Sequence, residues 1–163
     1  MKISDVMTKM IEYYQGDSKR VQHFMKVYAY AKAIGEQEEL EPELQEILEI
    51  AAVTHDIGIK KSEEKYNSSS GKYQEIEGPD EARKLLGEFG LKNETMDRIC
   101  YLIGHHHTYS RIDGIDYQIL VEADFLVNLE EDKSGMKAAH NVTKKIFVTK
   151  TGIHYLENLF FER

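Results

Sequence analysis

The part of the chain that decides the fold is an apolar run ending in a histidine and an aspartate, Ile47-Leu48-Glu49-Ile50-Ala51-Ala52-Val53-Thr54-His55-Asp56-Ile57-Gly58-Ile59. The run predicts a helix that ends near Gly58. A buried carboxylate without a partner is costly, so buried charges are usually paired or bound to a metal. His55 and Asp56 are therefore hard to explain as packing residues, and we treat them as candidate metal ligands.

Residues of the same kinds lie on both sides of this pair. His23 lies upstream, the triplet His105-His106-His107 follows downstream, and Asp124 lies inside another apolar segment, residues 119–127. An unpaired aspartate buried in that segment would destabilise the fold by several kcal/mol. The order of these residues predicts a metal site whose ligands come from several helices.

Apolar residues recur at helical spacing along the whole chain, which predicts an all-α protein. Gly35 is the predicted stop of one helix, and Pro79 is the predicted first residue of another. The polar segment 61–78 is predicted to be a loop that covers the site. The expected helices are residues 3–14, 17 or 18 to 34, 42–56, 79–89, 93 or 95 to the histidine triplet, 116–129, and 137–161 with a break at 149–152.

The composition is that of one globular domain. The chain has 163 residues, of which 41% are hydrophobic and 31% are charged. Its net charge of −8 argues against a large nucleic-acid partner. The single cysteine, Cys100, excludes a disulfide within the chain. Neither a signal peptide nor a run of about 20 apolar residues is evident, so we expect a cytoplasmic protein that does not contact a membrane.

The candidate ligands suit a divalent ion. Imidazole and carboxylate groups together accept manganese, iron, cobalt, nickel, zinc or magnesium, and the sequence leaves this choice open. On a regular helix His55 and Asp56 would point about 100° apart. They can therefore bind one ion only where the helix ends or loosens, and Gly58 is consistent with such an end.

This pattern resembles the HD-domain superfamily of metal-dependent phosphohydrolases. The resemblance extends over residues 17–130 and includes the context of the ligands: Arg20 before His23, Asp56-Ile57-Gly58, and Glu122-Ala123-Asp124. It implies a compact HD-domain helical bundle, with the whole chain, 1–163, as one domain. It also implies that one divalent ion is held by four residues, His23, His55, Asp56 and Asp124.

The resemblance leaves the number of ions open. In family members with two metals, further histidines lie between the HD pair and the last aspartate, and His105 and His106 resemble two of them. Another histidine is expected near Gly78-Pro79-Asp80, where this chain has none. Asp80 or Glu77 could take its place, but we predict a single ion.

The function that the resemblance implies is hydrolysis of a phosphomonoester or phosphodiester, with a nucleotide as one candidate, through a metal-activated water. Asp56 or Asp124 would orient the water. The groups expected to bind the phosphoryl group and stabilise it are Lys60, Arg20, His106 and His105. A nucleotidase subgroup carries glutamate where this chain has Ile59, and a second-messenger phosphodiesterase subgroup carries a Gly-Tyr-Pro signature that is missing here.

Two other functions stay open. One is an oxygenase with two irons, which would need the full second site. The other is a binding module in which the metal is structural or regulatory and a nucleotide binds without turnover. The apolar tail, Tyr155-Leu156 and Leu159-Phe160-Phe161, either packs on the chain's own core or forms a homodimer interface.

Overall fold

A computed structural model describes residues 1–133 and 136–161, and within these ranges the chain is helical and contains no strand. The all-α prediction is thereby confirmed. The last two residues of the predicted domain, 162 and 163, lie outside the described residues. The helices are α1 (Ile3–Tyr13), α2 (Ser18–Gln37), α3 (Pro42–Thr54), α4 (Gly58–Tyr66), α5 (Gly71–Leu86), a short 3₁₀ turn η1 (Gly87–Phe89), α6 (Asn93–Ile103), α7 (Ile115–Glu131), α8 (Met136–Lys145) and α9 (Lys150–Phe160).

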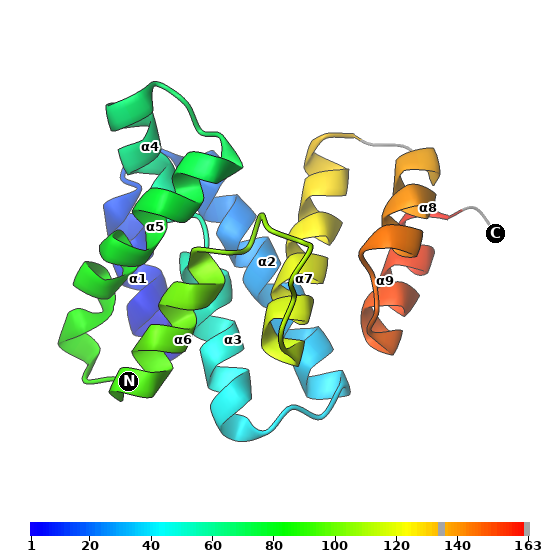
Figure 1. Cartoon of the computed structure of the whole chain (residues 1–163), viewed down its shortest axis with the longest axis horizontal. Coiled ribbons are helices and arrows are strands. Elements are labelled where there is room, and N and C mark those ends of the chain that lie inside the picture. The colour runs from blue at the N-terminus through cyan, green and yellow to red at the C-terminus, as the bar shows by residue number, and fades with distance from the viewer. Residues whose placement is uncertain (134–135, 162–163) are drawn as a thin grey trace.

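Helix α3 lies at the centre of the bundle, where it contacts α1, α2, α6 and α7 (Figure 1). Helices α4 and α5 form a hairpin at one end and continue into α6. Helices α8 and α9 pair at the other end, and α9 contacts α7 and α2. The buried segment that ends in the histidine–aspartate pair is thus surrounded by the helices that carry the other candidate ligands.

Helix α2 begins as predicted but ends later. The Asp17 side chain accepts a hydrogen bond from the backbone N–H of Arg20 and caps the helix. The predicted stop at Gly35 is wrong, because the helix continues to Gln37. A Cβ at Gly35 would lie 2.3 Å from Oε1 of Gln45, so this glycine permits a close helix contact and does not end the helix.

The predicted loop at 61–78 is wrong. Helix α4 extends to Tyr66 and α5 already begins at Gly71, so only a short turn separates them. The predicted helix start at Pro79 is also wrong, since Pro79 lies inside α5. The segment is polar because much of this hairpin faces solvent, while its inner side packs through Gly58 and Gly78.

Helix α7 carries a fully buried carboxylate that holds the start of α9. Glu122 accepts hydrogen bonds from the backbone N–H groups of Val148 and Thr149, at 3.0 Å each, and from the Thr149 hydroxyl. Thr149 in turn caps α9. The predicted break in the tail exists, but it lies at 146–149 and so begins three residues earlier than expected.

Among the described residues, no helix is both long and apolar enough to cross a membrane.

Candidate metal centre

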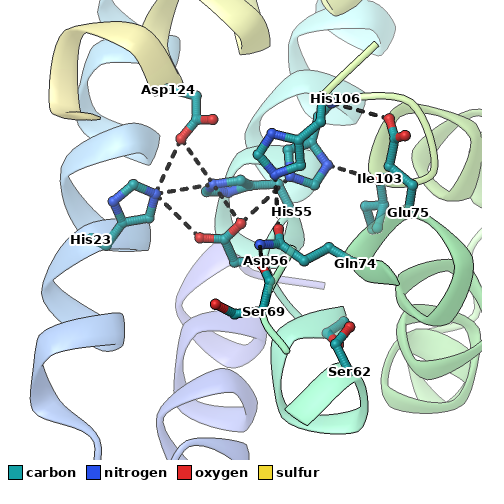
Figure 2. Close-up of polar contacts among 12 residues, drawn as sticks. His23, His55, Asp56, Ser62, Ser69, Gln74, Glu75, Ile103, His106 and Asp124 are labelled. Carbon is teal, nitrogen blue, oxygen red and sulfur yellow. Dashed lines mark hydrogen bonds and ion pairs between the residues drawn. The ribbon is translucent and has the colours of Figure 1, made fainter. Parts of the chain in front are cut away.

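The predicted ligands converge on one point inside the bundle (Figure 2). They come from three segments that are far apart in sequence: His23 from α2, His55 and Asp56 from the end of α3, and Asp124 from α7. His106, from the turn after α6, faces the same centre. The sequence prediction that helices assemble this cluster therefore agrees with the geometry.

The donor atoms in this cluster lie close together. Nε2 of His23 is 3.3 Å from Nε2 of His55, 3.1 Å from Oδ1 of Asp124 and 3.2 Å from Oδ2 of Asp56. Nε2 of His55 is 3.4 Å from a carboxylate oxygen of each aspartate. Nε2 of His106 is 3.5 Å from Oδ1 of Asp56. His23, His55, Asp56 and Asp124 thus bring donor atoms within 3.1–3.4 Å contacts of one another, and His106 adjoins them through Asp56.

A tight turn lets the adjacent His55 and Asp56 side chains face the same centre. Helix α3 ends at Thr54, and the next bonds run from Ile57 N–H to Thr54 O and from Ile59 N–H to Asp56 O, at 3.0 and 3.1 Å. These bonds span three residues instead of four and wind the chain more tightly. The helix end expected before Gly58 is therefore present.

Hydrogen bonds on the far side of the rings fix which nitrogen faces inward. Nδ1 of His55 donates to the carbonyl of Ala52, and Nδ1 of His106 donates to that of Ile103, both at 2.7 Å. Because a carbonyl only accepts, each neutral ring carries its proton on Nδ1 and turns the lone pair of Nε2 toward the centre. Nδ1 of His23 lies 2.9 Å from Oε2 of Glu131. Metal-binding histidines are typically held in this way.

The cluster fits a divalent cation. Nε2 of His106 is buried and has no hydrogen-bond partner among the described residues. Nε2 of His23 and Nε2 of His55 face each other without a proton to share when both rings are neutral, beside two carboxylates that only accept. A cation would satisfy all of these lone pairs at once, and imidazole with carboxylate suits borderline metals.

In the metal-free protein, protons on the histidines balance part of the negative charge of the two carboxylates. Burial lowers the pKa of His55, but the neighbouring Asp56 and Asp124 carboxylates outweigh it and raise the pKa to about 9. Asp124 and Asp56 likewise raise the pKa of His23 against the effect of burial. Burial raises the pKa of Asp56, but the His55 and His106 side chains hold it well below its usual range. The carboxylates are therefore ionised and the centre attracts positive charge.

Metal affinity is expected to rise with pH. Below about pH 9 the metal-free centre holds a proton on His55, and a binding ion must displace it. The apparent affinity should then increase by about tenfold per pH unit between pH 6 and 8 for each proton displaced. Calorimetric titrations of the metal-stripped protein in buffers of different ionisation enthalpy would count the protons released. An affinity independent of pH over this range would contradict the assignment.

The histidine triplet differs from the prediction in register. The ring of His105 stacks on Tyr101 with centroids 4.0 Å apart, and its Nδ1 donates to the carbonyl of that same residue. His107, together with His106 and Asp56, forms a second group of possible ligands. The pair nearest Asp56 is thus His106 and His107, whereas His105 and His106 were expected.

A side-chain amide of α5, and not a carboxylate or a histidine, contacts this second group. Oε1 of Gln74, from α5, lies 2.9 Å from Nε2 of His107. Glu77, one of the suggested substitutes for the missing histidine, pairs with Lys65 and Tyr66 on an exposed part of the hairpin. The other, Asp80, is exposed. Neither carboxylate joins the ligand groups of the described residues.

A cavity of about 350 Å³ opens beside the cluster. Four of its lining residues were not predicted from the sequence: Lys19, Gln74, Asn128 and Glu131. Helical spacing could have indicated two of them, because Lys19 precedes His23 by four residues and Asn128 follows Asp124 by four. The residues that line the cavity are Asp17, Lys19, Arg20, His23, Asp56, Ile59, Gln74, His107, Asp124, Asn128 and Glu131.

The two cationic side chains predicted to bind phosphate, Arg20 and Lys60, lie in different places. Arg20 lines the cavity, where its guanidinium pairs with Asp17 at 3.0 Å and Glu63 at 2.5 Å. Lys60 does not line it: Nζ donates to the backbone carbonyl of Tyr13 at 3.3 Å and lies 4.9 Å from the centre of that ring. Lys60 is thus held against the last residue of α1, outside the lining of the cavity.

Tyr14 holds the backbone of the ligand Asp56 in place. Its buried hydroxyl donates to the backbone carbonyl of Asp56 at 2.6 Å. Tyr14→Phe should therefore weaken metal binding by about tenfold, because partners that hold ligands in place typically contribute this much. The matched control is Tyr13→Phe, which removes a hydrogen bond to Glu81 outside the cluster. Competition with a metal indicator would measure both affinities, and equal values for the two variants would contradict this role.

Comparison with known proteins agrees with the fold and identifies the family. The family model described as HD domain matches residues 20–143. The structure is similar to a crystal structure described as a predicted HD superfamily hydrolase from an uncultured Thermotogales bacterium, with a TM-score of 0.69 and 21% identity over 95% of this chain and 83% of the other. A search of curated proteins found no match. With its histidine–aspartate pair at the centre of a matched helical bundle, this chain belongs to the HD domain family.

Proposed function

We propose that this protein is a metal-dependent phosphohydrolase that acts on a small phosphate ester. The observation that carries the proposal is the inward-facing set of His23, His55, Asp56 and Asp124 next to an open cavity that also contains cationic side chains. The similar structure from the Thermotogales bacterium is described as a predicted hydrolase, which supports the same reading. Those four residues, joined by His106, would hold the ion.

The chemistry depends on a charged centre at the end of a polar cavity. A divalent ion held there would lower the pKa of water and neutralise charge that develops on phosphorus. A ligand set of three imidazoles and two carboxylates suits manganese, iron, cobalt, nickel or zinc. In the reaction, water supplies an oxygen to phosphorus, the ester P–O bond breaks, and the released alcohol takes a proton.

Asp56 is the ligand best placed to orient the attacking water. Its side chain is 15% exposed, against 6% for Asp124 and 0% for His55, so it borders the cavity. Its low pKa keeps the carboxylate ionised and able to accept a hydrogen bond. Arg20, at the cavity wall, offers positive charge to the phosphoryl group.

A metal add-back screen tests this function. The protein is stripped with a chelator, loaded with one divalent metal at a time, and assayed on chromogenic phosphomonoesters and phosphodiesters and on nucleotides. We expect turnover that is absent from the stripped protein and returns with a particular metal. A variant at His154, an exposed residue of α9, is a control that should behave like the wild type. Tight metal binding without turnover on any ester would instead favour a binding module.

A further inference from the structure

Most polar side chains in the cavity wall already have partners within the protein. Asp17 pairs with Arg20, which also pairs with Glu63. The amide of Gln74 donates to the carbonyl of Ser69 at 2.7 Å and its oxygen contacts His107. These groups shape the cavity, but their hydrogen-bonding capacity is largely used.

Two side chains in the same wall have no such partner. Neither the ammonium group of Lys19 nor the side-chain amide of Asn128 makes a hydrogen bond or ion pair to another described residue, and both line the cavity. Lys19 lies one helical turn before His23 on α2, and Asn128 lies one turn after Asp124 on α7. Helices α2 and α7 contact each other, so the two free groups border the cavity from both sides next to the ligands.

The cavity also has little surface for an aromatic ring. Ile59 is its one apolar lining residue within the described part of the chain, and the two imidazoles in the lining, His23 and His107, already contact Asp56 and Gln74. Aromatic side chains of the neighbouring segments contact each other: Tyr66 stacks on Tyr73 with centroids 4.1 Å apart, and Tyr109 lies tilted against Phe125 with centroids 5.2 Å apart. Sites that bind a nucleobase generally offer it an aromatic face or an apolar slot.

We propose that Lys19 and Asn128 select the substrate, and that the substrate is a phosphomonoester of a small hydroxylated compound, such as a polyol or sugar, and not a nucleotide. The ammonium group of Lys19 binds a phosphate oxygen, and the Asn128 amide exchanges hydrogen bonds with a hydroxyl of the organic part. The cavity volume, about 350 Å³, lies near the lower end of ligand sites and accommodates one small substituent on phosphorus. This inference rests on the proposed function.

Steady-state kinetics on the metal-loaded protein would test it. The panel contains glycerol phosphate, sugar phosphates, nucleoside monophosphates and a chromogenic phosphomonoester. We expect kcat/KM to be at least about tenfold higher for the best polyol or sugar phosphate than for any nucleotide. The difference is expected because a cavity of about 350 Å³ with one apolar lining residue offers little favourable contact to a nucleobase.

Variants separate the two roles. Asn128→Leu should lower kcat/KM for the best hydroxylated substrate by roughly tenfold or more, mainly through KM, and leave the chromogenic ester within about threefold. Lys19→Met should lower kcat/KM for both substrates, since both carry the phosphate that Lys19 binds. Lys32→Met, in the same helix but outside the cavity, is the matched control and should match the wild type. Circular dichroism and metal content would confirm that each variant is folded and loaded.

The outcomes distinguish this inference from the function beneath it. Hydrolysis of the chromogenic ester with a preference for nucleotides would overturn the choice of substrate and leave the phosphohydrolase intact. An Asn128→Leu variant with unchanged selectivity would overturn the role of that amide. Absence of turnover on every ester, with the metal bound, would overturn the proposed function and this inference together.

Discussion

Asp56→Ala is expected to abolish metal binding and hydrolysis together. Asp56 contributes an oxygen to each side of the cluster: Oδ2 lies 3.2 Å from Nε2 of His23, and Oδ1 lies 3.5 Å from Nε2 of His106. Removing it takes away a ligand, the negative charge that attracts the ion and the acceptor that orients water. We expect metal affinity to fall by at least about 100-fold and kcat by roughly 10³-fold.

Metal content after dialysis, thermal unfolding with and without metal, and activity with saturating metal would measure these effects. The rise in melting temperature on metal addition should disappear in the variant, because a ligand stabilises only the state that binds it. Asp80→Ala is the matched control: this aspartate is exposed on α5 and should be dispensable. A folded Asp56→Ala protein that keeps its metal and its activity would contradict the assignment of the centre.

Gly58→Ala is expected to destabilise the protein by about 2–3 kcal/mol and to weaken metal binding at the same time. A Cβ at Gly58 would lie 2.5 Å from the carbonyl oxygen of Gln74 and 2.8 Å from the backbone nitrogen of Gly78. Both atoms belong to the backbone of α5, so the contact can be relieved only by moving the helix. Because Gly58 follows Asp56 closely, that movement would also displace the ligand.

Urea unfolding of the metal-free proteins, followed by circular dichroism, separates the stability effect from metal loss. Gly87→Ala is the control, since a Cβ there meets nothing within 4 Å and the backbone is already helical. It should be neutral or stabilise the protein by about 0.5–1 kcal/mol, because alanine restricts the unfolded chain. If Gly58→Ala unfolds at the same urea concentration as the wild type, the close helix crossing does not have the role assigned to it.

The ligands could be predicted because their chemistry conflicts with their surroundings. A histidine–aspartate pair at the end of an apolar run and Asp124 inside another are anomalies in the local pattern, and anomalies are visible without knowing the fold. The hairpin α4–α5 was missed for the opposite reason. Its segment is polar and rich in serine near the turn, so helix and loop look alike until packing against α6 is known.

The register of the triplet depended on one tertiary contact. Three consecutive histidines offer the same chemistry, and the ring of His105 is removed from the set by stacking on Tyr101. The place of Lys60 depended on another tertiary contact, because its ammonium group donates to the backbone carbonyl of Tyr13 on α1. Lys19 was accessible from the sequence in principle, because an unbroken helix separates it from His23 by one turn.

The separation of the ligands along the chain has a consequence for the folded state as a whole. His23 lies 32 residues from His55 and 101 residues from Asp124, so an ion bound by all three would close long loops, as a covalent cross-link does. A chain with a single cysteine has no internal disulfide to do this. At free metal about 1,000 times Kd, the ion would add about 4 kcal/mol to the stability. The supply of metal would then govern how long the protein survives proteolysis, apart from any reaction it catalyses.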